Sequence, residues 1–410
     1  MSYPCGFPAK DIVLFVNRAN YSEDSLAEVL TFAIGLVGGL SEHRLDVVFI
    51  GDGVTECVAS RLNDNTKPYL TSAKSRGVAF WADKYSLACA ILAAGCSKKN
   101  SNGAAAEKTV KIGIAKIVQH VALDDIERGV MDAIKAAGIN AEYDLQNANG
   151  DVNTANQIAA QFKDEKVDIA VGIATPVAVA LANTIKDVPV VFGTVTDPIN
   201  AGLVTTLAHG EKNVTGMSDE LPTVEHIKMF KKLAGIKTLG YIYTSSEDNS
   251  LSGLELVKKG CDEAGLKLVT QSISSSSEVK QAAEAIVNRV DGIYLTTDNT
   301  VFSALPALVG VFNKAKKPVF SGDVTGAKNG GCFMASGFNY YKAGVATGEI
   351  VVQILNGARP DEIPVRFMTK PSDSDLLFDL DAAALCGIVI PEEYLSQANY
   401  IIQNGKLEEK

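Results

Sequence analysis

From residue 109 onward, short apolar runs alternate with longer stretches in which apolar residues recur every three or four positions. The short runs predict strands, and the periodic stretches predict amphipathic helices. Run 167–174 (VDIAVGIA) is apolar almost throughout, which is typical of a parallel strand buried on both faces. The predicted strands cover 111–117, 141–148, 167–174, 188–193, 238–244, 266–273, 291–297 and 317–322, and the predicted helices cover 124–137, 153–164, 177–185, 249–264, 276–288, 301–313 and 340–356.

These elements form two successive α/β units, each built on a four-stranded parallel sheet. We therefore expect an α/β fold of two similar lobes within 109–410, with lobe 1 at about 109–220 plus about 338–365 and lobe 2 at about 221–337. Helix 340–356 can return the chain to lobe 1, and the C-terminal segment is left unassigned. Right-handed crossovers place the carboxyl ends of both sets of strands at one cleft, where open α/β sheets bind ligands.

Residues 1–87 carry a shorter α/β pattern of their own. Apolar runs at 11–16, 46–50 and 77–82 predict strands, and the periodic stretch 25–40 predicts a helix. A β-α-β-α-β unit with a small parallel sheet is expected there.

The segment that joins the two parts has the composition of a bacterial lipoprotein signal. Lys84 precedes an apolar run, and LAAGC (92–96) resembles a lipobox that ends at Cys96. Because the residues that follow are small and polar, 88–108 is interpreted as a lipobox-like segment and flexible linker. As an alternative, segment 84–96 fits the last helix of the first domain. No signal peptide is predicted at residue 1, so a lipoprotein signal at 84–96 would follow a folded domain. The connection between the two parts of the chain is therefore either a genuine fusion or a gene-model artefact.

Charge and cysteine usage exclude several classes of function. The chain has 38 basic and 48 acidic residues and a net charge of −10, which argues against nucleic acid as a partner because phosphates bind basic faces. Its 7 cysteines and 4 histidines are scattered without ligand spacing, so neither a metal site nor a disulfide framework is predicted. No apolar run reaches the roughly 18 residues that span a bilayer.

Polar residues cluster where the predicted strands end. Side chains of Thr, Ser, Asn and Asp at such positions cap the following helix, a role worth about 1 kcal/mol each. As a group facing one cleft they also suit a small ligand, since hydroxyls and helix N-termini bind a carboxylate, and Asp219, Asp298 or Asp323 can hold an ammonium. The predicted ligand-binding residues are Thr175, Thr196, Asp197, Asp219, Ser246, Asn249, Asp298, Asn299, Thr300 and Asp323.

Four aromatic residues lie near the predicted crossings between the lobes. They are candidates to surround an apolar ligand side chain, and the alternative is that they pack in the hydrophobic core. These residues are Phe302, Phe338, Tyr340 and Tyr341. The sequence contains no G-x-S-x-G, no P-loop and no G-x-G-x-x-G after a strand. We therefore predict a binding protein that is not an enzyme and that needs no cofactor.

Residues 110–405 resemble the ABC-transporter substrate-binding family, whose members include tryptophan- and phenylalanine-type binders. The resemblance rests on KIGIAKIVQHVALDDIERGVMDAIKAAG, QNANGDVNTANQIAAQF, DIAVGIATPVAVALAN, VPVVFGTVTDPINAGLV, NVTGMSD, TLGYIYTSSEDNS, GIYLTTDNT and GIVIPEEYLSQANYII. SGDV (321–324) departs slightly from the acidic run that the family carries there. The resemblance implies a two-lobed type I periplasmic-binding-protein fold. It also implies an amino-acid-like ligand, aromatic or branched, that an ABC permease receives, and an extracytoplasmic location with a lipid anchor at Cys96 if the signal is processed.

Residues 10–87 resemble a DsrE/DsrF-like sulfur-relay domain, through IVLFVNRANY, LTFAIGL, VVFIGDGV and the stretch from PYL to GVAFWAD. Members that carry sulfur use a cysteine. Cys57, after the Gly51-Asp52-Gly53 turn, is the nearest candidate, and a buried inert thiol is the alternative. A cytoplasmic persulfide carrier is therefore the rival function, with a cytoplasmic location if the N-terminal domain blocks export. A ligand-sensing regulator would need a DNA-binding helix-turn-helix, which residues 1–87 do not supply.

Overall fold

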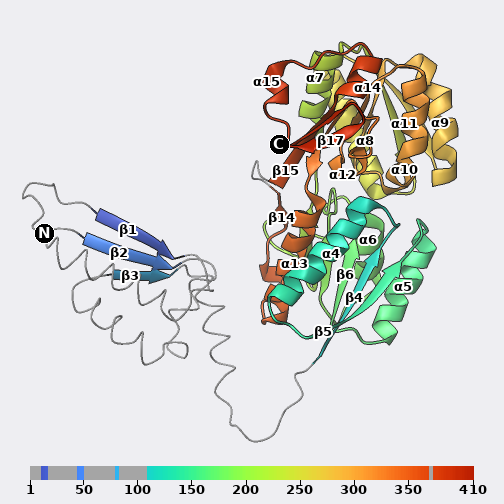
Figure 1. Cartoon of the computed structure of the whole chain (residues 1–410). Coiled ribbons are helices and arrows are strands. Elements are labelled where there is room, and N and C mark those ends of the chain that lie inside the picture. Colours follow the sequence, from blue (N-terminus) through green and yellow to red (C-terminus); the bar gives the residue numbers. More distant parts are fainter. Residues whose placement is uncertain (1–10, 17–43, 50–78, 83–108, 369–372) are drawn as a thin grey trace, which may run out of the picture. The chain divides into compact units, whose positions relative to one another are not determined.

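The computed structural model describes residues 11–16, 44–49, 79–82, 109–368 and 373–410 (Figure 1). The chain divides into two compact units, residues 1–105 and 106–410. In the first unit, β1 (Asp11–Val16), β2 (Arg44–Phe49) and β3 (Ala79–Ala82) form a parallel sheet in that order, as the three apolar runs predicted. The predicted helix 25–40, Cys57 and Cys96 lie outside the described residues.

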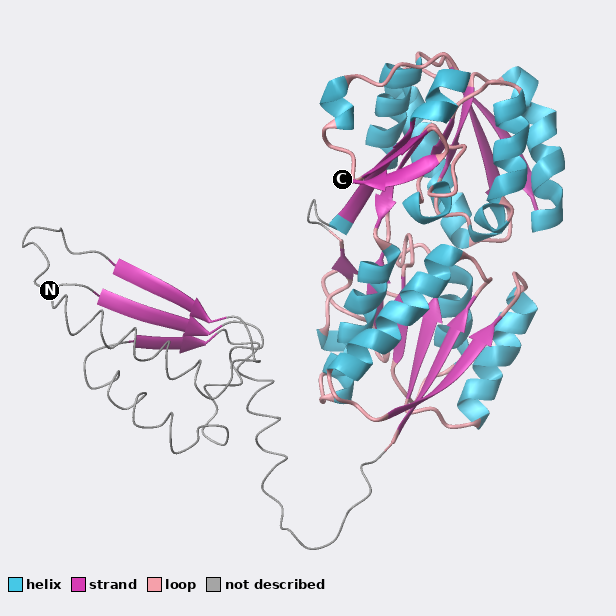
Figure 2. Cartoon of the chain, viewed as in Figure 1, coloured by secondary structure: helices cyan, strands magenta, loops and turns pink. Residues whose placement is uncertain are grey.

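The second unit consists of two α/β lobes, and Figure 2 shows helices packed around each sheet. The sheet of lobe 1 is parallel, with the strand order β14-β8-β7-β6-β4-β5. Its strands are β4 (Val110–Lys116), β5 (Ala141–Asn147), β6 (Ile169–Ile173), β7 (Val190–Gly193), β8 (Val214–Ser218) and β14 (Arg366–Phe367), and its helices are α4 (Val121–Ala136), α5 (Val152–Asp164), α6 (Thr175–Thr184) and α13 (Tyr340–Leu355). Strand β6 is buried along its whole length, as its unbroken apolar run predicted.

The sheet of lobe 2 has the order β10-β9-β11-β12-β13-β15-β16-β17. Its strands are β9 (Thr238–Thr244), β10 (Lys267–Ile273), β11 (Gly292–Leu295), β12 (Val319–Ser321), β13 (Met334–Phe338), β15 (Ser374–Asp379), β16 (Tyr400–Gln403) and β17 (Lys406–Glu409). Its helices are α7 (Thr223–Ala234), α8 (Asp248–Ala264), α9 (Val279–Ile286), α10 (Asn299–Ser303), α11 (Leu305–Lys314), α12 (Val324–Ala327), α14 (Leu380–Leu385) and α15 (Glu392–Leu395). The C-terminal segment, left unassigned from the sequence, therefore extends this sheet, with β15 antiparallel to β13.

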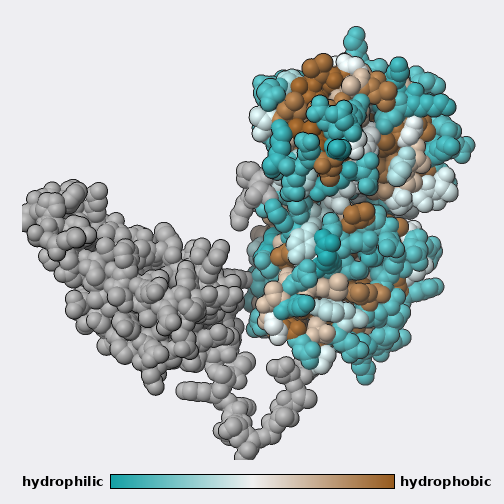
Figure 3. All heavy atoms as spheres, viewed as in Figure 1, coloured by the Kyte–Doolittle hydropathy of each residue, from teal (hydrophilic) through white to brown (hydrophobic). Residues whose placement is uncertain are grey.

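The chain passes between the lobes from β8 to α7, from β13 to α13, and from β14 to β15. Helix α13 packs into the core of lobe 1 through Ala343, Ile350 and Val351. In the view of Figure 3, hydrophilic residues dominate the outer edges of both lobes. No described helix is both long and apolar enough to span a membrane.

The predicted helix 301–313 is wrong as a single element. The structure breaks it at Ala304, so that α10 ends at Ser303 and α11 begins at Leu305. Pro306 is the cause, because its ring lacks the backbone N–H that would bond to the carbonyl of Phe302 and clashes with that carbonyl. The break leaves Phe302 on a short helix at the cleft.

Helices α4 and α13 approach so closely that glycine is required at their crossing. A Cβ added at Gly344 would lie 2.3 Å from the carbonyl oxygen of Ile126. We expect Gly344→Ala to lower the free energy of unfolding by about 1–3 kcal/mol, because the backbones must separate. Gly310→Ala in α11 is the matched control, since an added Cβ there has nothing within 4 Å. Equal midpoints of thermal unfolding for the two variants would contradict the prediction.

Candidate ligand-binding site

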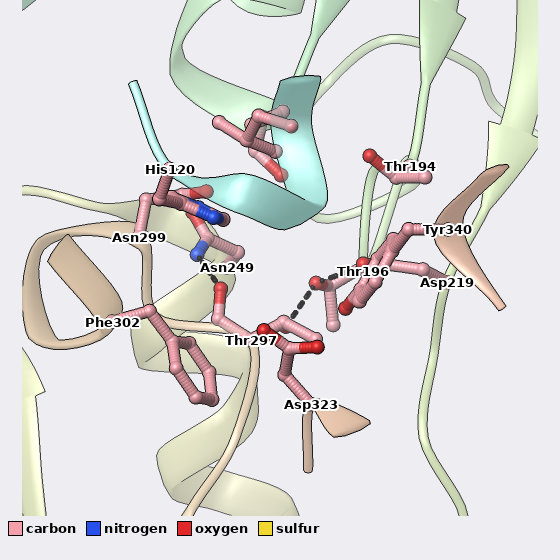
Figure 4. Close-up of a pocket in the computed structure, with 13 residues that line it drawn as sticks. His120, Thr194, Thr196, Asp219, Asn249, Thr297, Asn299, Phe302, Asp323 and Tyr340 are labelled. Atoms are coloured by element: carbon pink, nitrogen blue, oxygen red, sulfur yellow. Dashed lines mark hydrogen bonds between the residues drawn. The ribbon is translucent and has the colours of Figure 1, made fainter. Parts of the chain in front are cut away.

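A small pocket lies between the two lobes of the second unit (Figure 4). Its walls come from the ends of parallel strands and the first residues of the helices that follow them, as expected for open α/β sheets. Lobe 1 and α13 contribute His120, Leu123, Ala174, Thr175, Thr194, Thr196, Asp219 and Tyr340, and lobe 2 contributes Asn249, Thr297, Asn299, Phe302 and Asp323.

The lobe 1 wall contains two strained backbone positions. Ala174, which precedes α6, has φ 73° and ψ 156°, and Thr194, which follows β7, has φ 55°. Such conformations cost about 1–3 kcal/mol for a residue with a side chain, and they persist only where the surrounding structure enforces them. Both residues line the pocket. The fold therefore holds the start of α6 in a fixed orientation toward the pocket.

The lobes touch through two hydroxyl groups at the pocket. Thr196 Oγ1 of lobe 1 lies 2.8 Å from Thr297 Oγ1 of lobe 2 and also donates a hydrogen bond to Asp219 Oδ1 at 3.1 Å. Since a hydroxyl can donate one hydrogen and accept another, these contacts form a short chain from Thr297 through Thr196 to Asp219. The lobes are thus in a closed arrangement at this point.

Several buried polar atoms at the pocket have no partner within the protein. Of four such side-chain atoms in the described part of the chain, three belong to residues of this pocket: His120 Nε2, Thr175 Oγ1 and Asn249 Oδ1. An unpaired buried polar group costs about 1–3 kcal/mol, so such groups are rare unless another molecule satisfies them. Because they come from both lobes, a ligand that binds all three must hold the lobes together.

The pocket is acidic in its ionisable groups. Burial raises the pKa of Asp219 to about 6, and burial likewise raises the pKa of Asp323 to about 6. Burial lowers the pKa of His120 to about 4, so this imidazole is neutral at pH 7. No lysine or arginine is among the described residues that line the pocket. The arrangement suits a ligand with a buried positive charge.

We expect ligand affinity to fall below pH 6 if an ammonium group pairs with these carboxylates. The ammonium favours the ionised carboxylate, whereas the free protein holds a proton on it below its raised pKa. Between pH 7.5 and pH 5, the dissociation constant should rise by about tenfold for each carboxylate that must lose its proton. Calorimetric titrations at both pH values measure the ratio, and tighter binding at pH 5 would contradict the prediction.

The structure brings six of the predicted ligand-binding residues together at this pocket: Thr175, Thr196, Asp219, Asn249, Asn299 and Asp323. Asp323 also caps α12 by accepting hydrogen bonds from Thr325 N and Gly326 N. Asp323 therefore caps a helix and lines the pocket with the same side chain. Thr175, by contrast, lines the pocket with an unpaired hydroxyl.

The other four predicted residues do not line this pocket. Asp298 is directed into lobe 2, where it accepts hydrogen bonds from Thr244 N, Thr244 Oγ1, Val301 N and Ser250 Oγ. Thr300 donates to Glu247, Ser246 is exposed, and Asp197 accepts a hydrogen bond from Asn200 N in a separate part of the cleft. All four follow strand ends, as the pocket residues do. Their position along the chain therefore could not distinguish them from the residues that line the pocket.

The sequence prediction missed some of the pocket residues. His120 precedes α4 and was not selected, although it lies in a stretch that carries the family resemblance. Thr297 directly precedes the predicted Asp298, and Thr194 lies two residues before the predicted Thr196. Among the aromatic candidates, Phe302 and Tyr340 line the pocket. Tyr341 instead donates a hydrogen bond to Asp132, and Phe338 is buried without lining it.

The two lobes and the pocket between them define a two-lobed ligand-binding protein. The model of the family "ABC transporter substrate binding protein" matches residues 111–402, and the chain belongs to this family. Its similar proteins are solute-binding proteins and not enzymes, as the sequence predicted of this chain. The fold is the α/β type I periplasmic-binding-protein fold, again as predicted.

Three relatives are informative. A tyrosine-binding protein of Clostridioides difficile is 34% identical over 299 residues, which cover 70% of this chain and 86% of that protein. A crystal structure of an ABC domain from Streptococcus pneumonia in complex with L-Trp is 34% identical with a TM-score of 0.69, covering 72% of this chain and all (100%) of the other. A ligand-free, open structure of a substrate-binding protein with adhesive properties from Clostridium difficile is 35% identical with a TM-score of 0.53, covering 69% of this chain and 96% of the other.

The L-Trp complex and the ligand-free open structure have nearly the same sequence identity to this chain, but their TM-scores differ. At 34% and 35% identity, the L-Trp complex gives a TM-score of 0.69 and the ligand-free open structure gives 0.53. The higher similarity to the ligand-bound structure agrees with the hydroxyl contact between Thr196 and Thr297.

Proposed function

We propose that this protein captures an aromatic amino acid, such as L-tyrosine or L-tryptophan, by closing its lobes and then delivers it to an ABC permease. The observation that carries the proposal is the set of unpaired polar atoms from both lobes at one acidic pocket. The ligands named for the similar proteins, tyrosine and L-Trp, support the substrate class.

The pocket offers a complementary group for each part of a zwitterionic amino acid. The ligand ammonium pairs with Asp219 and Asp323, since buried carboxylates without a cation favour a positive partner. The ligand carboxylate accepts from the Thr175 hydroxyl at the start of α6, where the helix dipole favours an anion. The aromatic side chain lies against Leu123, Phe302 and Tyr340.

Lobe closure follows from these contacts. A ligand shifts the balance between open and closed forms only if it binds the closed form more tightly. Groups from both lobes supply that difference, because each lobe alone presents only part of the site.

Calorimetric titration of the full-length protein with a panel of amino acids tests the proposal. We expect an aromatic L-amino acid to bind with a dissociation constant of about 1 μM or below, equivalent to about −8 kcal/mol. The D-enantiomers and acidic amino acids serve as controls and should bind much more weakly. Absence of binding by every aromatic amino acid to the folded protein would exclude the proposed substrate class.

An extracytoplasmic location is part of this proposal, with a lipid anchor at Cys96 where the signal is processed. The sulfur-relay resemblance of residues 10–87 and the thiol of Cys57 remain predictions from the sequence. Both cysteines lie outside the described residues.

A further inference from the structure

A buried carboxylate behind the pocket, Glu247, organises the lobe 2 wall without lining it. Its residue is 3% exposed and lies between β9 and α8. It accepts hydrogen bonds from Asn249 Nδ2 at 3.1 Å and from Asn299 Nδ2 at 2.8 Å, both to Oε2. It also accepts from Asn299 N, and from Thr300 N and Thr300 Oγ1 at 3.1 and 2.6 Å. No salt bridge to Glu247 occurs among the described residues.

This carboxylate fixes which end of the Asn249 amide meets the pocket. An ionised carboxylate only accepts hydrogen bonds, so a side-chain amide that contacts it must present its NH₂ group. The carbonyl oxygen of Thr297 makes the same demand, since it accepts from Asn249 Nδ2 at 2.9 Å. The oxygen Asn249 Oδ1 is then the atom left over, and it is buried without a partner.

The same argument applies to Asn299. Its NH₂ group is bound to Glu247, so its oxygen faces out of lobe 2, where His120 of lobe 1 is a side-chain hydrogen-bond partner. Asn299 and Asn249 both line the pocket, together with the carboxylate of Asp323. The lobe 2 wall therefore presents hydrogen-bond acceptors from all three of these side chains.

We infer that Glu247 is a positioning residue that makes lobe 2 an acceptor surface and thereby selects ligands that present an ammonium group to it. The inference rests on the proposed function and deepens it, because it assigns the ligand's amine, and not its carboxylate, to the lobe 2 wall. A ligand carboxylate at Asn249 would face the unpaired oxygen of that amide and receive no hydrogen bond from it. The negative charge of Glu247, one hydrogen bond behind both amides, further favours a cation there.

The substitution Glu247→Gln tests the inference. Glutamine keeps the size of the side chain but offers its own NH₂ group, so the asparagine amides are no longer forced to present oxygen to the pocket. The readout is the ratio of dissociation constants for L-tyrosine and its analogue without the amine, 3-(4-hydroxyphenyl)propanoate. A purely structural role would weaken both ligands alike and leave this ratio unchanged.

We expect Glu247→Gln to reduce the preference for L-tyrosine by at least about tenfold, since oriented polar groups carry this discrimination. Thr300→Val is the matched control, because it removes the hydroxyl hydrogen bond to Oε1, keeps the one from the backbone N–H and leaves Oε2 bound to both asparagines. It should keep the preference of the wild type. Glu247→Asp retains a carboxylate that only accepts and should restore most of the preference.

The outcomes separate the two proposals. Wild-type protein that binds no amino acid overturns the proposed function and this inference with it. Wild-type binding with an unchanged preference in Glu247→Gln overturns the inference alone. If Glu247→Gln does not fold, a crystal of the wild-type complex decides: the ligand ammonium within hydrogen-bond distance of Asn249 Oδ1 supports the inference, and the ligand carboxylate there overturns it.

Discussion

Replacing Asp219 by asparagine is expected to weaken the binding of an aromatic amino acid by about 100-fold at pH 7.5, and Asp323→Asn is expected to have an effect of similar size. Breaking one partner of a buried charge pair costs about 2–5 kcal/mol, and each 1.4 kcal/mol corresponds to a factor of about 10. Asparagine is nearly the same size as aspartate and can still accept the hydrogen bond from Thr196, so the loss isolates the charge. Calorimetry at pH 7.5 measures the change.

Asp197→Asn is the control for this effect. Asp197 directly follows Thr196 in the chain but lines a separate part of the cleft. Its substitution should change the affinity by less than about twofold, as surface substitutions usually do. If Asp219→Asn and Asp323→Asn bind as tightly as Asp197→Asn, neither carboxylate holds the ligand's amine.

A disulfide between residues 196 and 297 is expected to stop ligand exchange. The two hydroxyl oxygens lie 2.8 Å apart across the lobes, which places the side chains within reach of one another. In the double variant Thr196→Cys, Thr297→Cys, oxidation should therefore lock the lobes closed. Ligand added after oxidation should not bind, and ligand added before oxidation should dissociate at least about 100-fold more slowly, because release requires opening.

Reduction with dithiothreitol should restore exchange in the double variant. Each single variant serves as a control for oxidation of the native cysteines. Among the described residues, Cys261 and Cys332 are buried and Cys386 is half-buried. Fluorescence-monitored dissociation of the amino acid provides the rates. An oxidised double variant that exchanges ligand at the rate of the reduced form would show that entry does not require the lobes to separate at these residues.

Much of the fold followed from hydrophobic periodicity. Long strands and helices such as β9 and α8 were predicted to within a residue, because a buried apolar run or a strong amphipathic face leaves few alternatives. The late strands β15, β16 and β17 were missed. Strand β15 pairs with β13 across the whole of α13, and β17 is exposed along its length, so it carries no apolar pattern. The break between α10 and α11 was missed although Pro306 signals it.

The site was predicted less completely than the fold. The rule that ligands lie at the carboxyl ends of strands selected Asn249, Asn299 and Asp323, which line the pocket; that they bind a ligand stays a prediction. It could not exclude Asp298, because only the tertiary partners Thr244 and Ser250 turn that side chain inward. Glu247 was not selected either, since its role depends on two amides from different loops.

A crystal structure of the full-length protein grown with the amino acid that binds most tightly tests the central claim most directly. The claim predicts one amino acid in the pocket between the lobes, with its ammonium near Asp219 or Asp323 and its carboxylate at Thr175. It also predicts contacts from the ligand to both lobes. Ligand density outside this pocket, or contacts confined to a single lobe, would contradict it.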